Sequence, residues 1–202
     1  MQKARCVVFV ALLLAGALAH AQKTELAVTF GAAVSPDGKG PVTCGEAILC
    51  QIPPGTLGPV SLGSGFSWQA SLAYRLTNLK AAALYLELPV ARSPSRIVPG
   101  SHDFSSFFFT PSAQVTLLPD KFASPFASIG GGLAHFGAFG SSGNTGAFQV
   151  GGGVDFRTPL RGLGIRAEAR DFITGHPEIF PVGAFNSRVQ HIFVGGGVVV
   201  KF

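Results

Sequence analysis

Apolar and polar residues alternate along several stretches of this chain. In residues 65–76, GFSWQASLAYRL, Phe66, Trp68 and Leu72 fall on one side and polar residues such as Gln69 and Arg75 on the other. A period of two is typical of a β-strand. The stretch is also close to the ~9–11 residues that a tilted strand needs to cross a bilayer. We therefore expect a membrane-spanning strand here.

The same alternation recurs in seven further segments. They are residues 24–33, 81–90, 106–117, 125–136, 147–157, 163–172 and 191–202. Glycines in 125–136 leave the two faces of that segment unassigned. In the last segment Ile192, Val194, Val198 and Phe202 share one face, and Lys201 points to the other. The pattern predicts eight strands.

Short and long connections alternate between these segments. Turn-forming residues make short links at 77–80, 119–121 and 158–162, whereas we expect long loops over 34–64, 92–105, 137–145 and 174–189. Tight periplasmic turns and long extracellular loops are typical of outer-membrane barrels. The chain is thus predicted to be all-β, an eight-stranded antiparallel up-and-down transmembrane β-barrel. The first loop is long enough for another hairpin, so ten strands is the alternative.

Composition supports a membrane location. Charged residues are 12% of the chain and apolar residues 47%, whereas soluble domains carry ~25% charged residues. Past the N-terminal segment, no apolar run is long enough for a membrane helix. A soluble lipocalin-like barrel is the rival fold, but its water-facing surface needs more Lys and Glu.

The N-terminal segment is typical of an export signal. Lys3 and Arg5 precede an apolar run, and Ala19-His20-Ala21 offers a cleavage site, so we expect a signal peptide over 1–21 and the barrel over 22–202. The rest carries thirteen basic and ten acidic residues, a formal charge of +3 with no basic run. A nucleic-acid partner is therefore excluded.

Cys44 and Cys50 are the two cysteines that remain after the signal segment. They lie in the first long loop, without a nearby histidine or third cysteine. In an oxidising compartment such a pair favours a disulfide over a metal site. We predict a disulfide and expect no metal and no cofactor.

Charged residues occupy predicted inward positions. These are Arg75, Glu87, Asp155, Arg157, Arg166, Glu168 and Arg170. Buried charges need partners of opposite sign, so we expect an ion network that fills the barrel. A narrow polar path is the alternative. Inward glycines such as Gly151 and Gly195 would make room for long side chains.

Histidines raise the question of lipid-modifying catalysis. His102 stands beside Ser101 and Asp103, but neighbours in sequence project in different directions. A nucleophile needs a base within hydrogen-bond reach and a third group that orients the base. The spacing enforces no such arrangement at His102 or His191, so we expect no enzyme.

The export signal, the eight alternating segments, RAEARDF and the terminal VGGGVVVKF together resemble the small bacterial outer-membrane barrels of the OmpA-type and OmpW-like group. The resemblance implies that Phe202 is the signal read by the barrel assembly machinery and that Glu168 and Arg170 lie inside the barrel. A peptidoglycan-binding domain, as in full-length OmpA, does not follow the barrel segments. The Cys44–Cys50 pair is not a hallmark of the group.

We therefore expect a structural or surface-interaction protein of the bacterial outer membrane. Its partners would be outer-membrane lipid, lipopolysaccharide and an extracellular ligand. Loop residues predicted to meet that ligand are Lys39, Glu46, Arg92, Arg96, His102 and His176. A narrow channel for small solutes is the second hypothesis, and a lipid-modifying barrel enzyme the third.

Overall fold

The computed structural model describes residues 24–36, 38–41, 57–60, 63–98, 101–119, 121–138, 141–175 and 189–202. Within them lie eleven strands: β1 Thr24–Val34, β2 Gly38–Pro41, β3 Leu57–Val60, β4 Ser64–Leu79, β5 Ala82–Val98, β6 Ser101–Phe109, β7 Ser112–Leu117, β8 Ala123–Ala138, β9 Ser141–Arg157, β10 Leu163–Thr174 and β11 Val189–Lys201. No helix among the described residues is long and apolar enough to cross a membrane.

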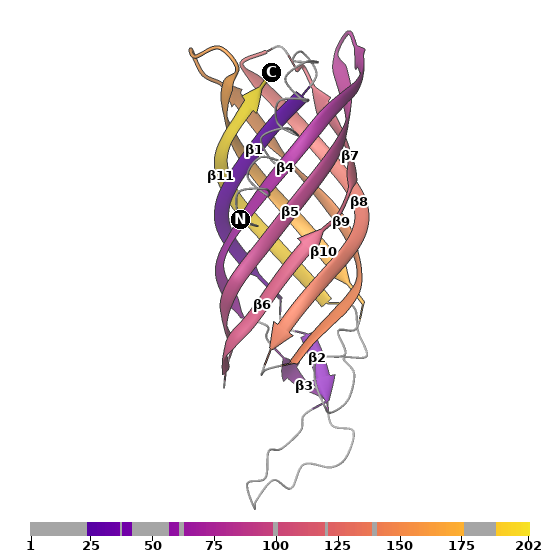
Figure 1. The fold of residues 1–202 in the computed structure, drawn as a ribbon, viewed down its shortest axis with the longest axis vertical. Helices are drawn as coiled ribbons and strands as arrows, with labels where there is room; N and C mark the ends of the chain where they lie inside the picture. Colours follow the sequence, from indigo (N-terminus) through magenta and orange to yellow (C-terminus); the bar gives the residue numbers. More distant parts are fainter. Residues whose placement is uncertain are drawn as a thin grey trace, which may run out of the picture.

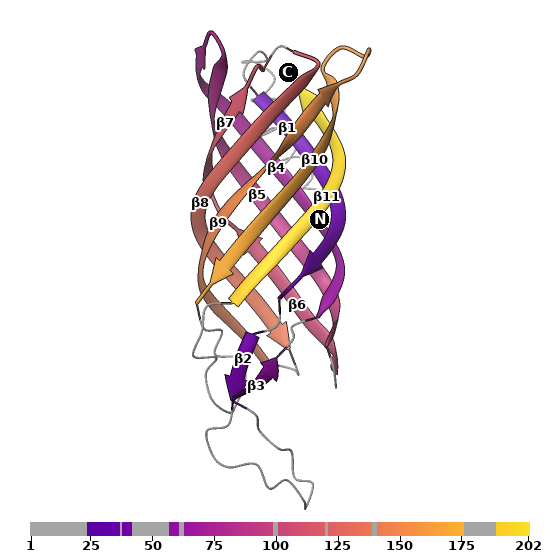
Figure 2. The same cartoon turned by 180° about the vertical axis from the view of Figure 1, so that it is seen from behind.

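Nine of these strands close into a barrel of eight positions (Figures 1 and 2). Neighbours are antiparallel, and β1 closes the circle by pairing with both β4 and β11. β6 and β7 both pair with β5 and β8, so the two share one position. The predicted eight-stranded antiparallel barrel is confirmed.

The break between β6 and β7 lies at Thr110–Pro111. Proline has no backbone N–H and cannot donate to the neighbouring strand. The Pro111 carbonyl still accepts a bond of 3.2 Å from the Gly131 backbone N–H. The predicted strand over 106–117 is therefore one barrel position interrupted by its proline.

The first long connection does contain a hairpin, as the ten-strand alternative required. That hairpin, β2–β3, forms a two-stranded sheet of its own and does not join the barrel. It lies beyond the barrel end opposite the C-terminus (Figures 1 and 2). The ten-strand alternative is therefore wrong.

Two of the expected long loops are strand instead. β5 and β6 together cover most of residues 92–105, and β8 and β9 cover most of 137–145. Here the outward positions become polar, as at Arg92, His135 and Asn144, while the strands continue. The apolar alternation ends before the hydrogen-bonded ladder does, which is why these segments resemble loops in the sequence.

The two faces of the sheet differ as the alternation predicts. Outward Phe66, Leu86 and Val198 are each about half exposed, whereas inward Gln69, Glu87 and Val199 are buried. β8, whose faces were unassigned, turns Phe126, Ser128, Ala134 and Phe136 inward and Ile129, Leu133 and His135 outward. The outside of the barrel is apolar up to polar positions such as His135, and its inside mixes charged, polar and aromatic groups.

Candidate functional site

The centre of the barrel holds Arg170, on β10, between two carboxylates. Its Nη2 and Nη1 lie 2.6 and 3.0 Å from the two oxygens of Glu87, on β5. Its Nε donates to Glu168 at 3.0 Å. All three side chains are buried. Bidentate hydrogen bonds between a guanidinium and a carboxylate are among the strongest hydrogen bonds in proteins.

A second cluster lies around Arg166, which is two residues before Glu168 on the same face of β10. Arg166 donates to both Asp155 oxygens, at 2.7 and 3.0 Å. Lys201 lies 3.1 Å from Asp155 and 3.4 Å from Glu25. The Arg166 guanidinium also lies 4.4 Å from the ring centre of Phe126. The cation therefore has partners on several sides.

The two clusters are joined. Arg166 reaches Glu87 at 4.0 Å and Glu25 at 3.8 Å. Thr29 and Gln69 donate to Glu168, and Ser112 donates to Glu87 at 2.9 Å. Strands on different sides of the barrel thereby meet across the bore, and most charged oxygens have a donor. We call this set the ion network: Glu25, Glu87, Asp155, Arg166, Glu168, Arg170 and Lys201.

Five of the seven residues expected to form a network lie in it. Arg75 is at its edge, where its Nε donates to the Tyr85 hydroxyl at 3.0 Å. Arg157 is exposed at the end of β9. Glu25 and Lys201 were missed, although each stands at an inward position of its strand. The alternation marked these positions, but only the pairing of β1 with β11 brings them together.

Inward glycines leave room for the large side chains. A Cβ at Gly151 would lie 2.7 Å from Cγ of Arg170, and one at Gly153 would lie 2.8 Å from the Phe126 ring. At Gly195 a Cβ would lie 2.5 Å from the ring of Phe193. Each distance is far below van der Waals contact, so a larger residue would displace the neighbouring side chain or backbone.

Phenylalanines form a second layer toward the end opposite the C-terminus. Phe108 stacks on Phe172 with ring centres 4.5 Å apart and meets Phe136 edge-on at 5.7 Å. Phe104 lies 5.8 Å from Phe136, and Phe193 belongs to the same buried cluster. We call these five residues the aromatic layer. It was not predicted, because five inward rings on four strands show no pattern until the register is known.

Arg96 corrects a prediction. It was expected in a loop facing a ligand, but it is buried inside the barrel at 1% exposure. The β5–β6 register shifts between Ser93 and Arg96, so the alternation changes side there. A β-bulge moves every following side chain to the opposite face. Arg92 keeps its outward, exposed position.

Arg96 is held by neutral groups, and it forms no ion pair with a carboxylate of the described residues. It donates to the hydroxyls of Ser35 and Ser106 at 2.8 and 3.1 Å, and its Nη1 lies 3.0 Å from Nδ1 of His191. Ser35 also lies 3.0 Å from that Nδ1. A hydroxyl beside an imidazole suggests a nucleophile with its base. Both are enclosed inside the barrel, where neither reaches the lipid face.

The remaining predicted residues have mixed outcomes. The signal segment 1–21, Cys44, Cys50, Glu46 and His176 lie outside the described residues, so the disulfide and the signal peptide stay predictions. Lys39 lies on β2 and His102 on β6. Phe202 follows β11, and its backbone N–H donates to Thr24 at 2.9 Å. Among the described residues, no cluster of His, Cys, Asp and Glu could hold a metal ion.

Comparisons with known proteins agree on the fold. No protein family matches the sequence, and no curated protein does. Neisserial surface protein A (NspA) is 16% identical with a TM-score of 0.56, over 89% of this chain and 97% of that one. The outer membrane protein AlkL is also 16% identical, with a TM-score of 0.50 and 90% of each chain covered. The chain therefore has the fold of the small outer-membrane barrels.

Proposed function

We propose that this barrel is a non-conducting, non-enzymatic protein of the bacterial outer membrane that holds its extracellular loops in a structural or surface-interaction role. The observation that carries the proposal is the filled interior. The ion network and the aromatic layer lie one behind the other along the bore. The described residues form the barrel wall and the side chains that fill its interior.

An eight-stranded barrel has an interior just wide enough for side chains to fill. Here Arg166 and Arg170 are each bonded to carboxylates of other strands, and the stacked rings of Phe108 and Phe172 close a second level. To open a path, an ion would have to break paired charges and then pass a layer of close-packed rings. Either step is costly in a low-dielectric interior.

The outer face has an apolar band suited to lipid and, beyond it, a polar rim suited to water or lipopolysaccharide. On β5 the outward residues Leu84, Leu86, Leu88 and Val90 are followed by exposed Arg92. On β8 the outward Leu133 is followed by His135, whose Nδ1 lies 2.7 Å from Oδ1 of Asn144. An apolar band with polar groups beyond it is typical of transmembrane barrels. We propose lipopolysaccharide as the partner of this polar outer rim.

Conductance in planar bilayers tests the proposal. We expect no steady current from the folded wild-type chain, and none from Arg92→Ala, an exposed control that leaves the ion network intact. A stable wild-type current that changes in Arg170→Ala would instead support a narrow channel and overturn the proposal. Heat-modifiable migration in detergent gels establishes that each variant is a folded barrel.

Lipid modification is tested separately. Folded protein is incubated with lipopolysaccharide and with phospholipid, and the lipid products are analysed by mass spectrometry. We expect no product. Turnover that is lost in His102→Ala but retained in His135→Ala would identify an enzyme and refute the non-enzymatic role.

A further inference from the structure

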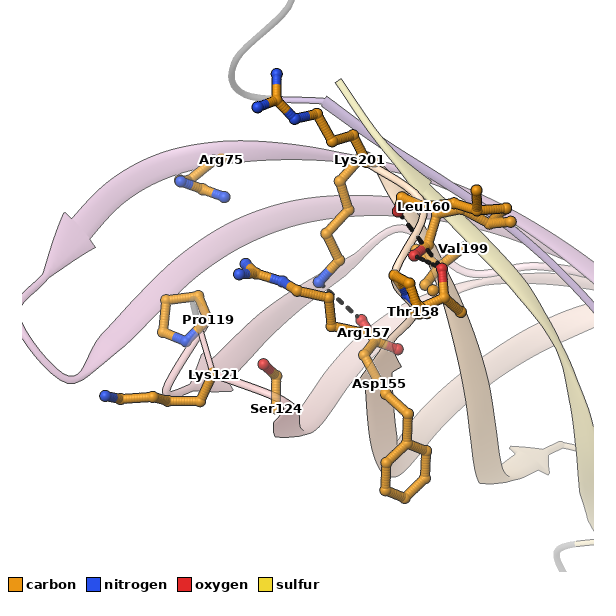
Figure 3. A pocket seen from close by; sticks show the side chains of 16 residues that line it. Arg75, Pro119, Lys121, Ser124, Asp155, Arg157, Thr158, Leu160, Val199 and Lys201 are labelled. Atoms are coloured by element: carbon orange, nitrogen blue, oxygen red, sulfur yellow. Dashed lines mark hydrogen bonds and ion pairs between the residues drawn. The ribbon is translucent and has the colours of Figure 1, made fainter.

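A cavity of about 370 Å³ opens at the barrel end that carries the C-terminus (Figure 3). It is bordered by the ends of β4, β9 and β11, by the turn before β8 and by the turn over residues 158–162. Gly162 in that turn has a φ of +76°, and its carbonyl accepts a 2.7 Å bond from the Lys201 backbone. The turn is thereby fixed against the last strand. We call this cavity the turn-side mouth.

Basic residues outnumber acidic ones in its lining. Five of them, Arg75, Lys121, Arg157, Arg161 and Lys201, face one acidic residue, Asp155. In Figure 3 the charged ends of Arg75 and Arg157 lie on the same side as that of Lys201, which is directed at Asp155, and Lys121 lies on the turn at the edge. The five cations come from four separate segments of the chain. Such a gathering of like charge costs free energy unless an anion offsets it.

Two acidic groups that the structure describes near the mouth, Asp155 and Glu25, already have cationic partners. Asp155 accepts two hydrogen bonds from Arg166 and one ion pair from Lys201. Glu25 faces Lys201 and Arg166. The Tyr85 hydroxyl that Arg75 contacts is neutral in the ordinary pH range. Among the described residues, Arg75, Lys121 and Arg161 therefore add positive charge that Asp155 and Glu25 do not offset.

We propose that the turn-side mouth binds a phosphate-bearing anion. Guanidinium groups match phosphate oxygens with parallel hydrogen bonds, and lysines add charge. The lining also has an apolar part: Leu160, 65% exposed, lies next to Arg161, and exposed Phe122 follows Lys121 in the sequence. That apolar part fits acyl chains, so the phosphate can belong to an anionic phospholipid headgroup or to a free anion. The inference goes beyond the scaffold role and does not depend on it.

The experiment uses the full folded chain and two probes. Pyrophosphate is titrated by calorimetry into protein in a zwitterionic detergent. Bound phosphatidylglycerol is counted by native mass spectrometry after reconstitution in phosphatidylcholine nanodiscs doped with that lipid. We expect saturable binding that weakens with salt. Binding should weaken about tenfold in Arg161→Gln, and further in Arg75→Gln combined with it, as expected for lost charge-assisted bonds.

Arg92→Gln is the matched control. It also removes one positive charge, but Arg92 does not line the turn-side mouth, so binding should stay unchanged. Retention of phosphatidylglycerol alone assigns the site to a lipid headgroup, whereas pyrophosphate alone assigns it to a soluble anion. Binding of both assigns it to the phosphate group itself. No saturable binding of either probe, or an equal loss in Arg92→Gln, overturns the proposal. Arg161 lies in an exposed turn, so its variant tests the site even if Arg75→Gln fails to fold.

Discussion

The buried arginines of this barrel have different kinds of partner. Arg170 and Arg166 lie against carboxylates, whereas Arg96 lies among hydroxyls, the His191 ring nitrogen and the Phe104 ring. Removing one partner of a buried ion pair strands the other charge. Removing a buried cation that faces only neutral groups strands no charge. The same substitution at the two kinds of site should therefore have different effects on stability.

Arg170→Met should lower the free energy of unfolding by about 3–5 kcal/mol, because Glu87 and Glu168 lose their cation. Arg96→Met should change it by less than about 1 kcal/mol, because its contacts are hydroxyls and an imidazole. Urea unfolding in lipid vesicles measures both. Equal losses of unfolding free energy in the two variants would show that the carboxylates around Arg170 do not set its contribution to stability.

Gly151 lies directly against Arg170 of the ion network. In Gly151→Ala the new methyl would meet Arg170 Cγ and the Ala169 carbonyl, so we expect a loss of about 1–3 kcal/mol. Gly146, on the same strand, has nothing within 4 Å of its Cβ position. Gly146→Ala should therefore be neutral or slightly stabilising in the same unfolding assay. A Gly151→Ala barrel as stable as wild type would mean that Arg170 moves aside at no cost.

At the scale of the strands, the sequence predicted faces better than it predicted ends. Period-two alternation shows which side of a strand meets lipid, so Leu86 and Glu87 were assigned correctly. It ends where the outer face becomes polar, and β5 therefore extends to Val98, well past its predicted end. The alternation also does not reveal a β-bulge, and the bulge between Ser93 and Arg96 is why Arg96 was wrongly expected to face outward. Ion partners were beyond its reach, since Arg170 and Glu87 are 83 positions apart and meet only through barrel closure.

A charge on the outer face tests which solvent that face meets. Leu86 is 46% exposed at the middle of the apolar band of β5, and Leu117 is 49% exposed beside a turn. In a bilayer, Leu86→Arg should cost about 2–4 kcal/mol and Leu117→Arg about 0–1 kcal/mol, because the penalty falls toward the interface. Unfolding in vesicles compares the two. Small and equal costs would indicate a water-facing surface and a soluble, lipocalin-like barrel.

The whole molecule combines a closed wall, a filled interior and a separate hairpin. Every barrel strand has two neighbours, so no edge is open to another chain. The contents tie opposite walls together through Glu87, Arg170 and Glu168. The β2–β3 sheet has no strand pairing with the wall. The barrel and its contents are therefore separate in strand pairing from the β2–β3 hairpin.

The wall should therefore fold without the first connection. In a chain lacking residues 37–62, Pro36 would be joined directly to Gly63. The two ends already approach each other, since the Ser35 backbone N–H donates to the Gly63 carbonyl at 3.2 Å. Shortening the connection also lowers the entropy cost of closing it. We expect unchanged heat-modifiable migration and a free energy of unfolding within about 1 kcal/mol of wild type, as for a surface change away from the core.

The same variant tests the surface role. If the first connection contacts an extracellular partner, attachment of whole cells carrying the shortened barrel to a surface coated with that partner should fall, while the amount of barrel in the outer membrane stays constant. Arg92→Ala, an exposed change on β5 outside the first connection, controls for effects of the remaining outer rim. A shortened chain that no longer assembles would show instead that residues 37–62 help to form the wall, and the division between wall and presented hairpin would be wrong.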